Sequence, residues 1–492
     1  MIPIIRKLLL TFFVLLIGLI AVILYRAATI SQPPIDVDPV EHAEIDSSSV
    51  VDRFSEALTY RTISPQEPED FEPEVFLSFI DFVEDSYPNL HESLERELIN
   101  DYSLLYTWEG SDPDKDPVML IGHYDVVPVE PGTEDDWSYP AWDGTIAEGF
   151  FWGRGAIDDK SGVISTFEAI EHLIEEGFEP ERTIMLGIGH DEEIGGLEGA
   201  RKIAETLKER DIQIKYLIDE GMPIAEQIME GIDSPVAMIG VAEKGYLSLR
   251  LNVRQSGGHS SMPANETSIS ILSDAINNIR QNPMDGDFSD LLRQTFRPIT
   301  PELPFAERMV LSNIWLFSGL IESQFSNIPY INAALRTTFA PTIFDSGVKE
   351  NVIPQSASAI ANFRIHPMDD VESVKDHVRR KVDDDRVTVE EMPRARNPSP
   401  VTDYESEQYR ILQTAIQEAF PDMPVAPIFF LAATDSRHYH DLTDHVFRFR
   451  PIRATPADQT RIHGTDERIG VSNYLEMIQF QIRLLKNSSQ TD

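Results

Sequence analysis

The residues VMLIGHYDVV, numbers 118–127, set a pattern that recurs along this chain. An uncharged apolar run is typical of a buried β-strand, and polar residues follow it at once. His123 and Asp125 stand two positions apart at the end of this strand, where side chains with a period of two point the same way. An imidazole beside a carboxylate suits a metal ligand and the group that orients it, although a structural histidine satisfied by its neighbour has the same pattern.

Four further clusters of acidic or histidine residues follow. They are 153–162 with Asp158, 190–196 with Glu192 and Glu193, 217–221 with Asp219, and 461–467 with His463. Each has an ordinary explanation by itself, such as a helix N-cap or a solvated acidic loop. Together they place two histidines and several carboxylates at one edge of a sheet, which is where open α/β sheets bind ligands.

The overall charge and the lack of cysteine restrict the partners and the metal ligands. The 492-residue chain carries 41 basic and 83 acidic residues, and its net charge of −42 repels nucleic acid, which we exclude as a partner. Because salt screens the self-repulsion of such a surface, we expect a salty habitat. Because the chain has no cysteine, any metal must be bound by histidine, aspartate and glutamate.

The N-terminus carries an apolar segment long enough for a membrane. Leu8–Tyr25 contains no charged residue, and at ~1.5 Å per residue it spans ~27 Å, close to the thickness of a bilayer's hydrocarbon core. Basic residues precede it and acidic residues follow it, so we expect an uncleaved anchor with the body on the extracytoplasmic side, in a periplasm or lumen. The alternative is a cleaved signal and a secreted protein.

Strands alternate with helices in the first half of the chain. We predict strands at 117–121, 183–188 and 214–218, and helices at about 161–176 and 198–209. This order predicts an α/β domain with a mixed, mainly parallel sheet and helices on both faces.

The pattern changes after Lys244, where apolar and polar residues alternate over 247–253 as in a strand with one buried face. A helix, an irregular proline-bearing region at 283–350 and further strand and helix patterns follow, which predict an inserted α+β lid or dimerisation domain of two layers. The division that we expect is an anchor or signal at 1–29, a linker at 30–46, a catalytic domain at 47–242 and 395–486, the inserted domain at 243–394, and a disordered tail at 487–492.

The clusters, taken in order, resemble the family of dinuclear zinc peptidases that includes carboxypeptidase S, aminoacylase, succinyl-diaminopimelate desuccinylase and bacterial glutamate carboxypeptidase. The resemblance runs from about residue 48 to residue 486. The sequence is most similar to the branch of carboxypeptidase S and the N-fatty-acyl-amino-acid hydrolases, which share the runs NFRIHP and TDSR found here at 362–367 and 434–437.

The resemblance implies roles for individual residues. It implies two Zn²⁺ ions per subunit, or Co²⁺ or Mn²⁺ instead, with Asp158 as the bridging ligand. The implied metal ligands are His123, Asp158, Glu193, Asp219 and His463. The implied catalytic residues are Glu192 as the general base, Asp125 as the group that orients His123, and His259, often from the neighbouring subunit, as the oxyanion donor. The implied substrate-binding residues are Asn351, Arg364 and Arg437.

We therefore expect an amidohydrolase or carboxypeptidase that cuts an amide bond next to a free carboxylate. The substrate is either a short peptide or an N-acyl amino acid, and the inserted domain is expected to form a homodimer. Phe305, Trp315, Phe317 and Phe325 of the 283–350 region either shape an acyl pocket or simply pack. Two alternatives are a non-catalytic, metal-stabilised, membrane-anchored binding protein and a metallophosphoesterase. The retained Glu192 and Asp125 argue against the first, and the lack of a basic phosphate-binding loop argues against the second.

Overall fold

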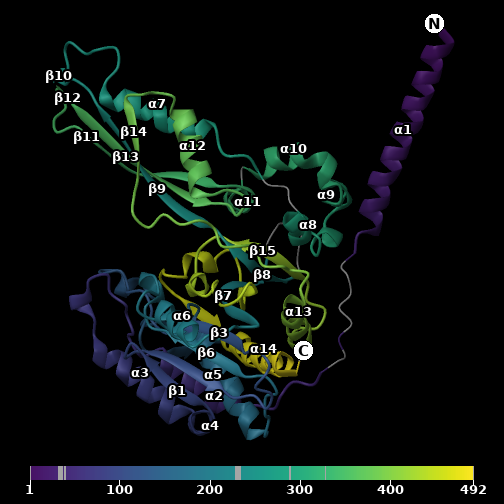
Figure 1. The fold of residues 1–492 in the computed structure, drawn as a ribbon, viewed down its shortest axis with the longest axis vertical. Coiled ribbons are helices and arrows are strands. Elements are labelled where there is room, and N and C mark those ends of the chain that lie inside the picture. Colours follow the sequence, from purple (N-terminus) through teal and green to yellow (C-terminus); the bar gives the residue numbers. More distant parts are fainter. Residues whose placement is uncertain are drawn as a thin grey trace.

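The computed structural model describes residues 2–31, 37, 40–227, 234–286, 290–326 and 328–490, and its largest element is an eight-stranded sheet in the lower half of the molecule (Figure 1). In spatial order the strands are β1 (Glu95–Ile99), β2 (Ser103–Trp108), β6 (Ile184–Gly189), β3 (Val118–His123), β7 (Tyr216–Ala225), β16 (Val446–Ala454), β8 (Val236–Glu243) and β15 (Val425–Phe430). The central strands β6, β3, β7 and β16 run parallel, whereas β1, β2 and the β16–β8 pair are antiparallel. The predicted α/β class with a mixed, mainly parallel sheet is confirmed.

Side chains of β3 show how both faces of this sheet are buried. Val118 and Leu120 enter one core, with helices α5 (Lys160–Glu175) and α14 (Val471–Gln490). Met119 and Ile121 enter a second core on the opposite face, with helix α6 (Ala200–Glu209). The alternation follows from the period of two in an extended chain. The helices over the two faces are α2 (Ser47–Ala57), α3 (Pro73–Ser86), α4 (Pro88–Ser93), α5 (Lys160–Glu175), α6 (Ala200–Glu209), α13 (Glu407–Ala419) and α14 (Val471–Gln490).

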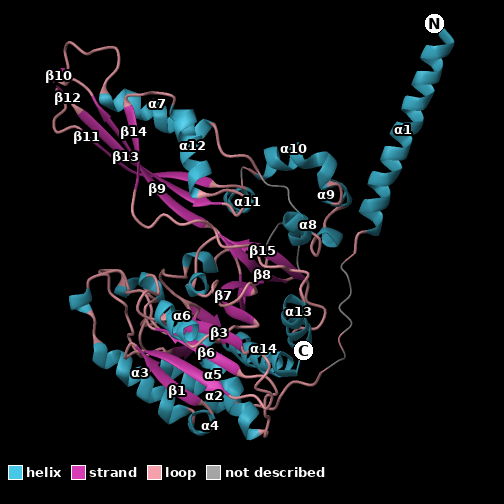
Figure 2. Cartoon of the chain, in the orientation of Figure 1, coloured by secondary structure: helices cyan, strands magenta, loops and turns pink. Residues whose placement is uncertain are grey.

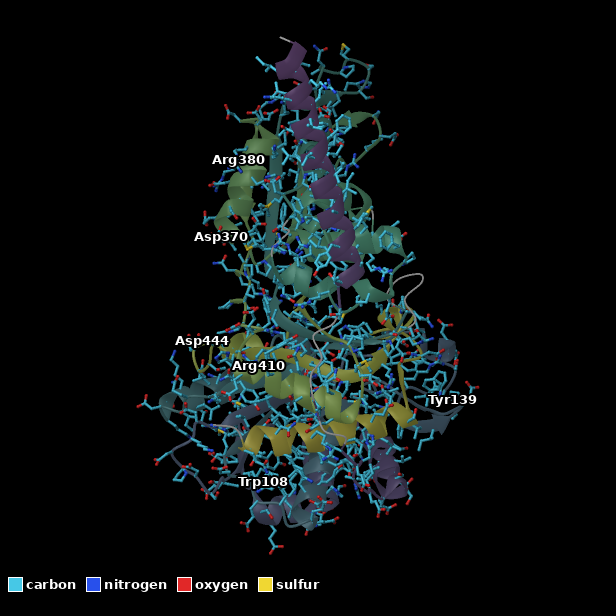
Figure 3. The ribbon with its side chains drawn as sticks, turned by 90° about the vertical axis from the view of Figure 1, so that its right-hand side faces the viewer. Trp108, Tyr139, Asp370, Arg380, Arg410 and Asp444 are labelled. Carbon is cyan, nitrogen blue, oxygen red and sulfur yellow. The ribbon has the colours of Figure 1, made fainter. Side chains whose placement is uncertain are left out.

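A second body, which we call the lid, stands above the large sheet (Figure 2). Its antiparallel sheet has the order β11 (Thr338–Ser346), β13 (Ser356–Ile365), β9 (Gly245–Arg254) and β14 (Val387–Glu391). Helices α7 (Ser268–Gln281) and α12 (Val371–Val382) pack on one face, where alternate residues of β13 from Ala357 to Ile365 are buried. A two-stranded pair, β10 (Gly258–His259) with β12 (Val352–Ile353), forms the tip of the lid. The side view shows Asp370 and Arg380 of the α12 region in the upper body and Trp108 at the opposite end (Figure 3).

The region 283–350, expected to be irregular, contains four short helices among its described residues. They are α8 (Asp290–Phe296), α9 (Phe305–Leu311), α10 (Ile314–Phe325) and α11 (Pro329–Leu335). Leu292 and Phe296 of α8 pack on Ala426 and Ile428 of β15, so these helices cover the edge of the large sheet and are not a layer of the lid.

The expectation of a disordered tail is wrong for residues 488–490. Helix α14 continues to Gln490, and Ser488 and Ser489 are buried. Tyr216 donates a hydrogen bond to Ser488 Oγ at 2.5 Å, and the amide of Arg182 donates to the Ser489 carbonyl at 3.2 Å. These contacts anchor the end of the chain in the core.

Helix α1 (Ile2–Thr29) stands apart from the body, at the upper right of Figure 1. Within the described residues it is the one helix that is long and apolar enough to cross a membrane. Its final turns touch the body: Ile23 and Ala27 are buried, and Asn313 Nδ2 donates to the Ile23 carbonyl at 3.2 Å. Of the predicted linker, residues 32–36, 38 and 39 lie outside the described residues.

Candidate metal centre

Two groups of potential metal ligands share the carboxylate of Asp158. His123 Nε2 lies 3.0 Å from Asp158 Oδ1 and 3.3 Å from Glu220 Oε1. His463 Nε2 lies 3.1 Å from the other oxygen, Asp158 Oδ2, and 3.2 Å from Glu193 Oε2. Each oxygen of Asp158 therefore faces a different imidazole, and the ligand atoms within each group all lie within 4.8 Å of one another.

The fold explains why residues so distant in sequence meet. His123 ends β3, Glu193 follows β6 in the short helix Glu192–Ile194, and Glu220 lies in β7. These three strands are parallel neighbours, so their carboxyl ends share one edge of the sheet. Asp158 lies just before α5, and His463 lies in the loop after β16 with a φ of 61°.

Asp125 connects two of these loops. Its carboxylate lies 3.3 Å from His123 Nδ1, and it accepts hydrogen bonds from the backbone amides of Glu192 at 3.1 Å and Glu193 at 3.2 Å. Asp125 is fully buried. A carboxylate in this position holds the imidazole so that Nε2 faces the cluster.

Two buried ion pairs support the loop that carries Asp158. Glu467 accepts hydrogen bonds from the amides of Ile157 at 2.8 Å and Asp158 at 3.2 Å and pairs with Arg154 at 2.5 Å. Asp159 pairs with Arg450 at 3.1 Å, and Arg450 also donates to the Ile121 carbonyl at 2.7 Å. Sequence reasoning assigned no role to these residues, although Asp159 and Glu467 stood within the acidic clusters.

The structure places Glu220, and not Asp219, in the ligand cluster. The carboxylate of Asp219 instead accepts hydrogen bonds from the amides of Ser436 and Glu220, both at 2.8 Å. Adjacent residues of a strand point to opposite sides, so only one of the two can reach Asp158. Our sequence-based choice of Asp219 as a ligand is therefore replaced by Glu220.

Glu192 lies beside the cluster and close to a guanidinium group. Its Oε1 is 3.9 Å from Arg437 Nη2, which is also 3.7 Å from Asp435 Oδ1. Burial, together with the neighbouring Asp435, raises the pKa of Glu192 well above its usual value. The structure thus brings the predicted base and one predicted substrate-binding arginine together.

The predicted oxyanion donor, His259, and the two remaining predicted substrate-binding residues lie on the lid, at its two ends. His259 and Asn351 are exposed at the tip, where the Ser260 amide donates to the Asn351 carbonyl at 3.2 Å. The tip stands far from β3 in Figure 1, so neither residue joins the metal cluster of its own chain. Arg364 lies at the base of the lid, with its guanidinium 5.2 Å from the ring of Tyr246.

Sequence reasoning missed Arg396, which stands at the start of the predicted second catalytic segment, 395–486. Burial, with the positive charges of Arg437 and Arg364 nearby, lowers the pKa of its guanidinium. The backbone of Arg396 forms a β-bridge with that of Tyr246. The guanidinium of Arg364 contacts the ring of the same tyrosine. Three arginines therefore gather between the base of the lid and Glu192.

The electrostatics of the cluster fit bound cations. Burial and the charge of Asp158 raise the pKa of Glu220 well above its usual value. Hydrogen bonds to Asp158 and Glu193 raise the pKa of His463 to about 10. Divalent cations bound here would supply positive charge to these carboxylates. Imidazole and carboxylate ligands suit Zn²⁺ and also Co²⁺ or Mn²⁺.

An apolar cavity of about 730 Å³ adjoins the cluster. Ile157, Gly221 and Ile462 line it, and each is next in sequence to a residue of the cluster. Residues of helices α8 and α11, including Phe296 and Ile331, also line it. Of the aromatic residues that we considered for an acyl pocket, Phe305, Trp315 and Phe317 are not among its lining residues, and the side chain of Phe325 lies outside those described.

Comparison with known proteins agrees with this geometry. Residues 119–487 match the family described as peptidase family M20/M25/M40. The chain is 37% identical over 490 residues to "Probable carboxypeptidase S-like 2" of Dictyostelium discoideum, covering 97% of this chain and 93% of that protein. It is 37% identical over 456 residues to the mouse "N-fatty-acyl-amino acid synthase/hydrolase PM20D1", covering 92% and 90%.

Solved structures show the same fold at low sequence identity. Human carnosine dipeptidase 1 matches with a TM-score of 0.63 and 17% identity, over 90% of this chain and 97% of that one. The metallo-carboxypeptidase Sso-CP2 of Sulfolobus solfataricus matches with a TM-score of 0.62 and 17% identity, over 91% and 100%. The family match, the similarity over nearly the whole chain and the shared fold agree, and the chain therefore belongs to peptidase family M20/M25/M40, a family of metal-dependent hydrolases.

Proposed function

We propose that this protein hydrolyses the amide bond of N-acyl amino acids that carry a long apolar acyl chain. The observation that supports this substrate is the apolar cavity beside the metal cluster, whose volume of about 730 Å³ lies within the range of roughly 300–1,000 Å³ typical of small-molecule sites. An acyl chain in this cavity would place its carbonyl at the cluster. The similarity to N-fatty-acyl-amino acid hydrolases supports the same reading.

We assign His123, Asp158 and Glu220 to one metal ion and Asp158, Glu193 and His463 to a second ion, most simply two Zn²⁺. Divalent cations held there supply positive charge that polarises a carbonyl group and lowers the pKa of water. Asp125 keeps His123 in the orientation that this binding needs. The site thus combines five ligand side chains with a separate acidic residue, Glu192, next to them.

Glu192 is the general base in this proposal. It takes a proton from the water that attacks the carbonyl carbon, and it passes this proton to the amide nitrogen as the C–N bond breaks. The products are a carboxylic acid and an amine, and Glu192 ends in its starting ionisation state. The adjacent Arg437 keeps the side chain on the substrate side of the cluster.

The amino acid's free carboxylate requires a positive partner. Arg437, with Arg364 and Arg396 nearby, forms a group of guanidinium ions on the side of Glu192 that faces the lid. A guanidinium fork matches a carboxylate in shape and charge. We assign substrate carboxylate binding to this group.

His259 and Asn351 act in this proposal on the neighbouring subunit of a homodimer. Both are exposed on the lid tip and lie away from the cluster of their own chain. A second copy whose lid reaches across would bring them to the scissile carbonyl, where His259 would donate to the developing oxyanion. We further propose that α1 is retained as a membrane anchor, with the catalytic body on the extracytoplasmic side.

The test compares two substrates with one enzyme preparation. Purified protein loaded with Zn²⁺ should hydrolyse N-oleoylglycine with a far higher kcat/KM than the dipeptide Gly-Leu, measured by release of the free amine. The reverse preference would replace this proposal with a carboxypeptidase acting on short peptides, which the similarity to carboxypeptidase S-like proteins favours.

A further inference from the structure

The adjoining helices α9 and α10 expose large apolar side chains. Phe305 and Trp315 are each 48% exposed and Leu316 is 41% exposed. The opposite side of these helices is already packed, because Leu311, Ile314 and Ile321 are buried in the core beside β15. We call the surface formed by Phe305, Trp315 and Leu316 the outer surface. Single exposed apolar residues are common on protein surfaces. Three large ones on adjoining helices suggest a surface that contacts another molecule or a membrane.

The membrane-spanning candidate α1 is attached at this same place. Asn313, between α9 and α10, donates its side-chain amide to the Ile23 carbonyl at 3.2 Å. Ile23 and Ala27 are buried there, while α1 is exposed over the apolar run that precedes them. Arg26 ends that run, so this contact lies where α1 would leave a bilayer. Figure 1 shows α9 beside the lower end of α1.

The apolar cavity borders the core on which these helices pack, because Leu292 and Phe296 line the cavity and belong to the same core as Leu311 and Ile314. Ile328, between α10 and α11, lines the cavity and is also 42% exposed. It therefore marks a rim where the cavity meets the surface, close in sequence to the end of α10. Ile157, Gly221 and Ile462, which adjoin metal ligands in sequence, line the same cavity.

We propose that the outer surface of α9 and α10 lies in the interface of a lipid bilayer beside α1, and that the substrate's acyl chain passes from the bilayer into the cavity past Ile328. The occupant is a neutral lipid surface, because a chain with a net charge of −42 is repelled by anionic lipid and gains only from apolar contact. The identity of the acyl chain rests on the proposed function, whereas the contact with lipid does not.

Trp315 offers a direct test of the lipid contact. The full chain carries five tryptophans, and the other four lie between residues 108 and 152, away from α10. In phosphatidylcholine vesicles with brominated acyl chains, the wild type should lose part of its tryptophan fluorescence, and Trp315→Phe should abolish that loss. Equal quenching of the two proteins, or none in either, would overturn the proposal.

A pair of matched variants tests whether the acyl chain enters the cavity from the bilayer. Leu316→Glu alters the outer surface, and Leu77→Glu alters a leucine of similar exposure, 38%, on α3 of the catalytic body. With N-oleoylglycine dissolved in vesicles, Leu316→Glu should slow hydrolysis several-fold, and Leu77→Glu should not. Both should hydrolyse water-soluble N-butanoylglycine at the wild-type rate. An equal effect of the two variants on the vesicle substrate would overturn delivery from the bilayer.

Two further outcomes distinguish the lipid contact from the proposed function and from a dimer interface. Quenching of Trp315 in a protein that hydrolyses neither N-acyl substrate supports the lipid contact and overturns the proposed function instead. If Leu316→Glu converts a dimer into a monomer and Trp315 is not quenched, the occupant of the outer surface is a second copy and the proposal is overturned.

Discussion

Asp158 presents each of its carboxylate oxygens to a different histidine, and this arrangement depends on the residues behind it. Glu467 holds the amides of Ile157 and Asp158, and Asp125 holds His123 from the other side. A buried carboxylate that accepts several hydrogen bonds has little freedom to rotate, which keeps the ligand atoms in register before a metal arrives.

Replacing Glu220 by glutamine should remove metal, whereas replacing Asp219 by asparagine should not. Only the Glu220 carboxylate faces His123, and an asparagine at 219 retains an oxygen that accepts from the amide of Ser436. Metal content of the purified proteins, measured by atomic emission, decides between them. Loss of metal from Asp219→Asn with full occupancy in Glu220→Gln would restore the original assignment of Asp219.

Glu192→Gln should keep its metal content and lose about 10²–10⁴-fold in kcat, the range expected when a general base is removed. The amide of glutamine retains the shape of the side chain but cannot accept the water's proton. Glu198→Gln, at an exposed acid only six positions away, is the matched control and should retain wild-type activity. Near-normal turnover by Glu192→Gln would remove this residue from the mechanism.

At the scale of elements, the short helices α8 and α11 give the large sheet an apolar extension. They cover its β15 edge and leave the cavity between themselves and the metal-bearing loops. Lys244, at the junction between β8 and β9, donates to the carbonyls of Ala333 and Arg336, both at 2.7 Å, and so ties α11 to the base of the lid. Under the proposed function, helices that are not part of the metal site would therefore limit the length of the acyl chain that fits.

Ala334→Phe should raise the KM for N-oleoylglycine and leave the KM for N-butanoylglycine nearly unchanged. Ala334 lines the cavity on α11, and a phenyl ring would occupy volume that a long chain needs. Ala333→Phe on the same helix is the control, because the cavity lining does not include Ala333. Equal KM changes for both substrates would mean that the cavity does not hold the acyl chain.

At the scale of the whole molecule, the charge is far from balanced, and the lid extends away from the catalytic body. The lid's outer strand β11 is exposed over most of its length, including Ile343 and Phe344. An exposed strand edge is a ready template for pairing with another chain. This supports the expected homodimer, in which one lid would serve the site of its partner.

Mixing inactive subunits should restore activity if the lid acts across a dimer. A dimer of Glu192→Gln with His259→Ala contains one site with both a wild-type base and a wild-type lid histidine. We expect activity to appear after the two purified variants are mixed and exchanged, measured against each variant alone. Mixtures that stay inactive while forming dimers would place His259 outside the reaction.

The temperature of unfolding should rise between low salt and about 1 M NaCl, because salt screens repulsion among surface charges. The chain has 83 acidic and 41 basic residues, so its self-repulsion is large at low ionic strength. Thermal unfolding followed by circular dichroism measures the change. A midpoint that does not move with salt would contradict the expectation of a salty habitat.

Sequence reasoning reached the sheet and most of the metal cluster for a local reason. Alternating burial identifies strands such as β3, and neighbouring parallel strands bring His123 and Glu193 to one edge by topology alone. The family match then confirmed the resemblance that these clusters suggested.

The remaining features depend on contacts between distant parts of the chain, which local sequence patterns do not reveal. Asp219 and Glu220 are adjacent acids, and only the direction of β7 against β3 and β16 shows which one faces Asp158. Likewise, the position of α8 on β15, the burial of Ser488 and the cavity between separate helices arise from long-range packing. The sequence by itself determined the features that follow from strand period and parallel topology, namely the sheet and the meeting of its polar loops at one edge. The tertiary structure decided the features in which side chains far apart in the chain compete for the same space.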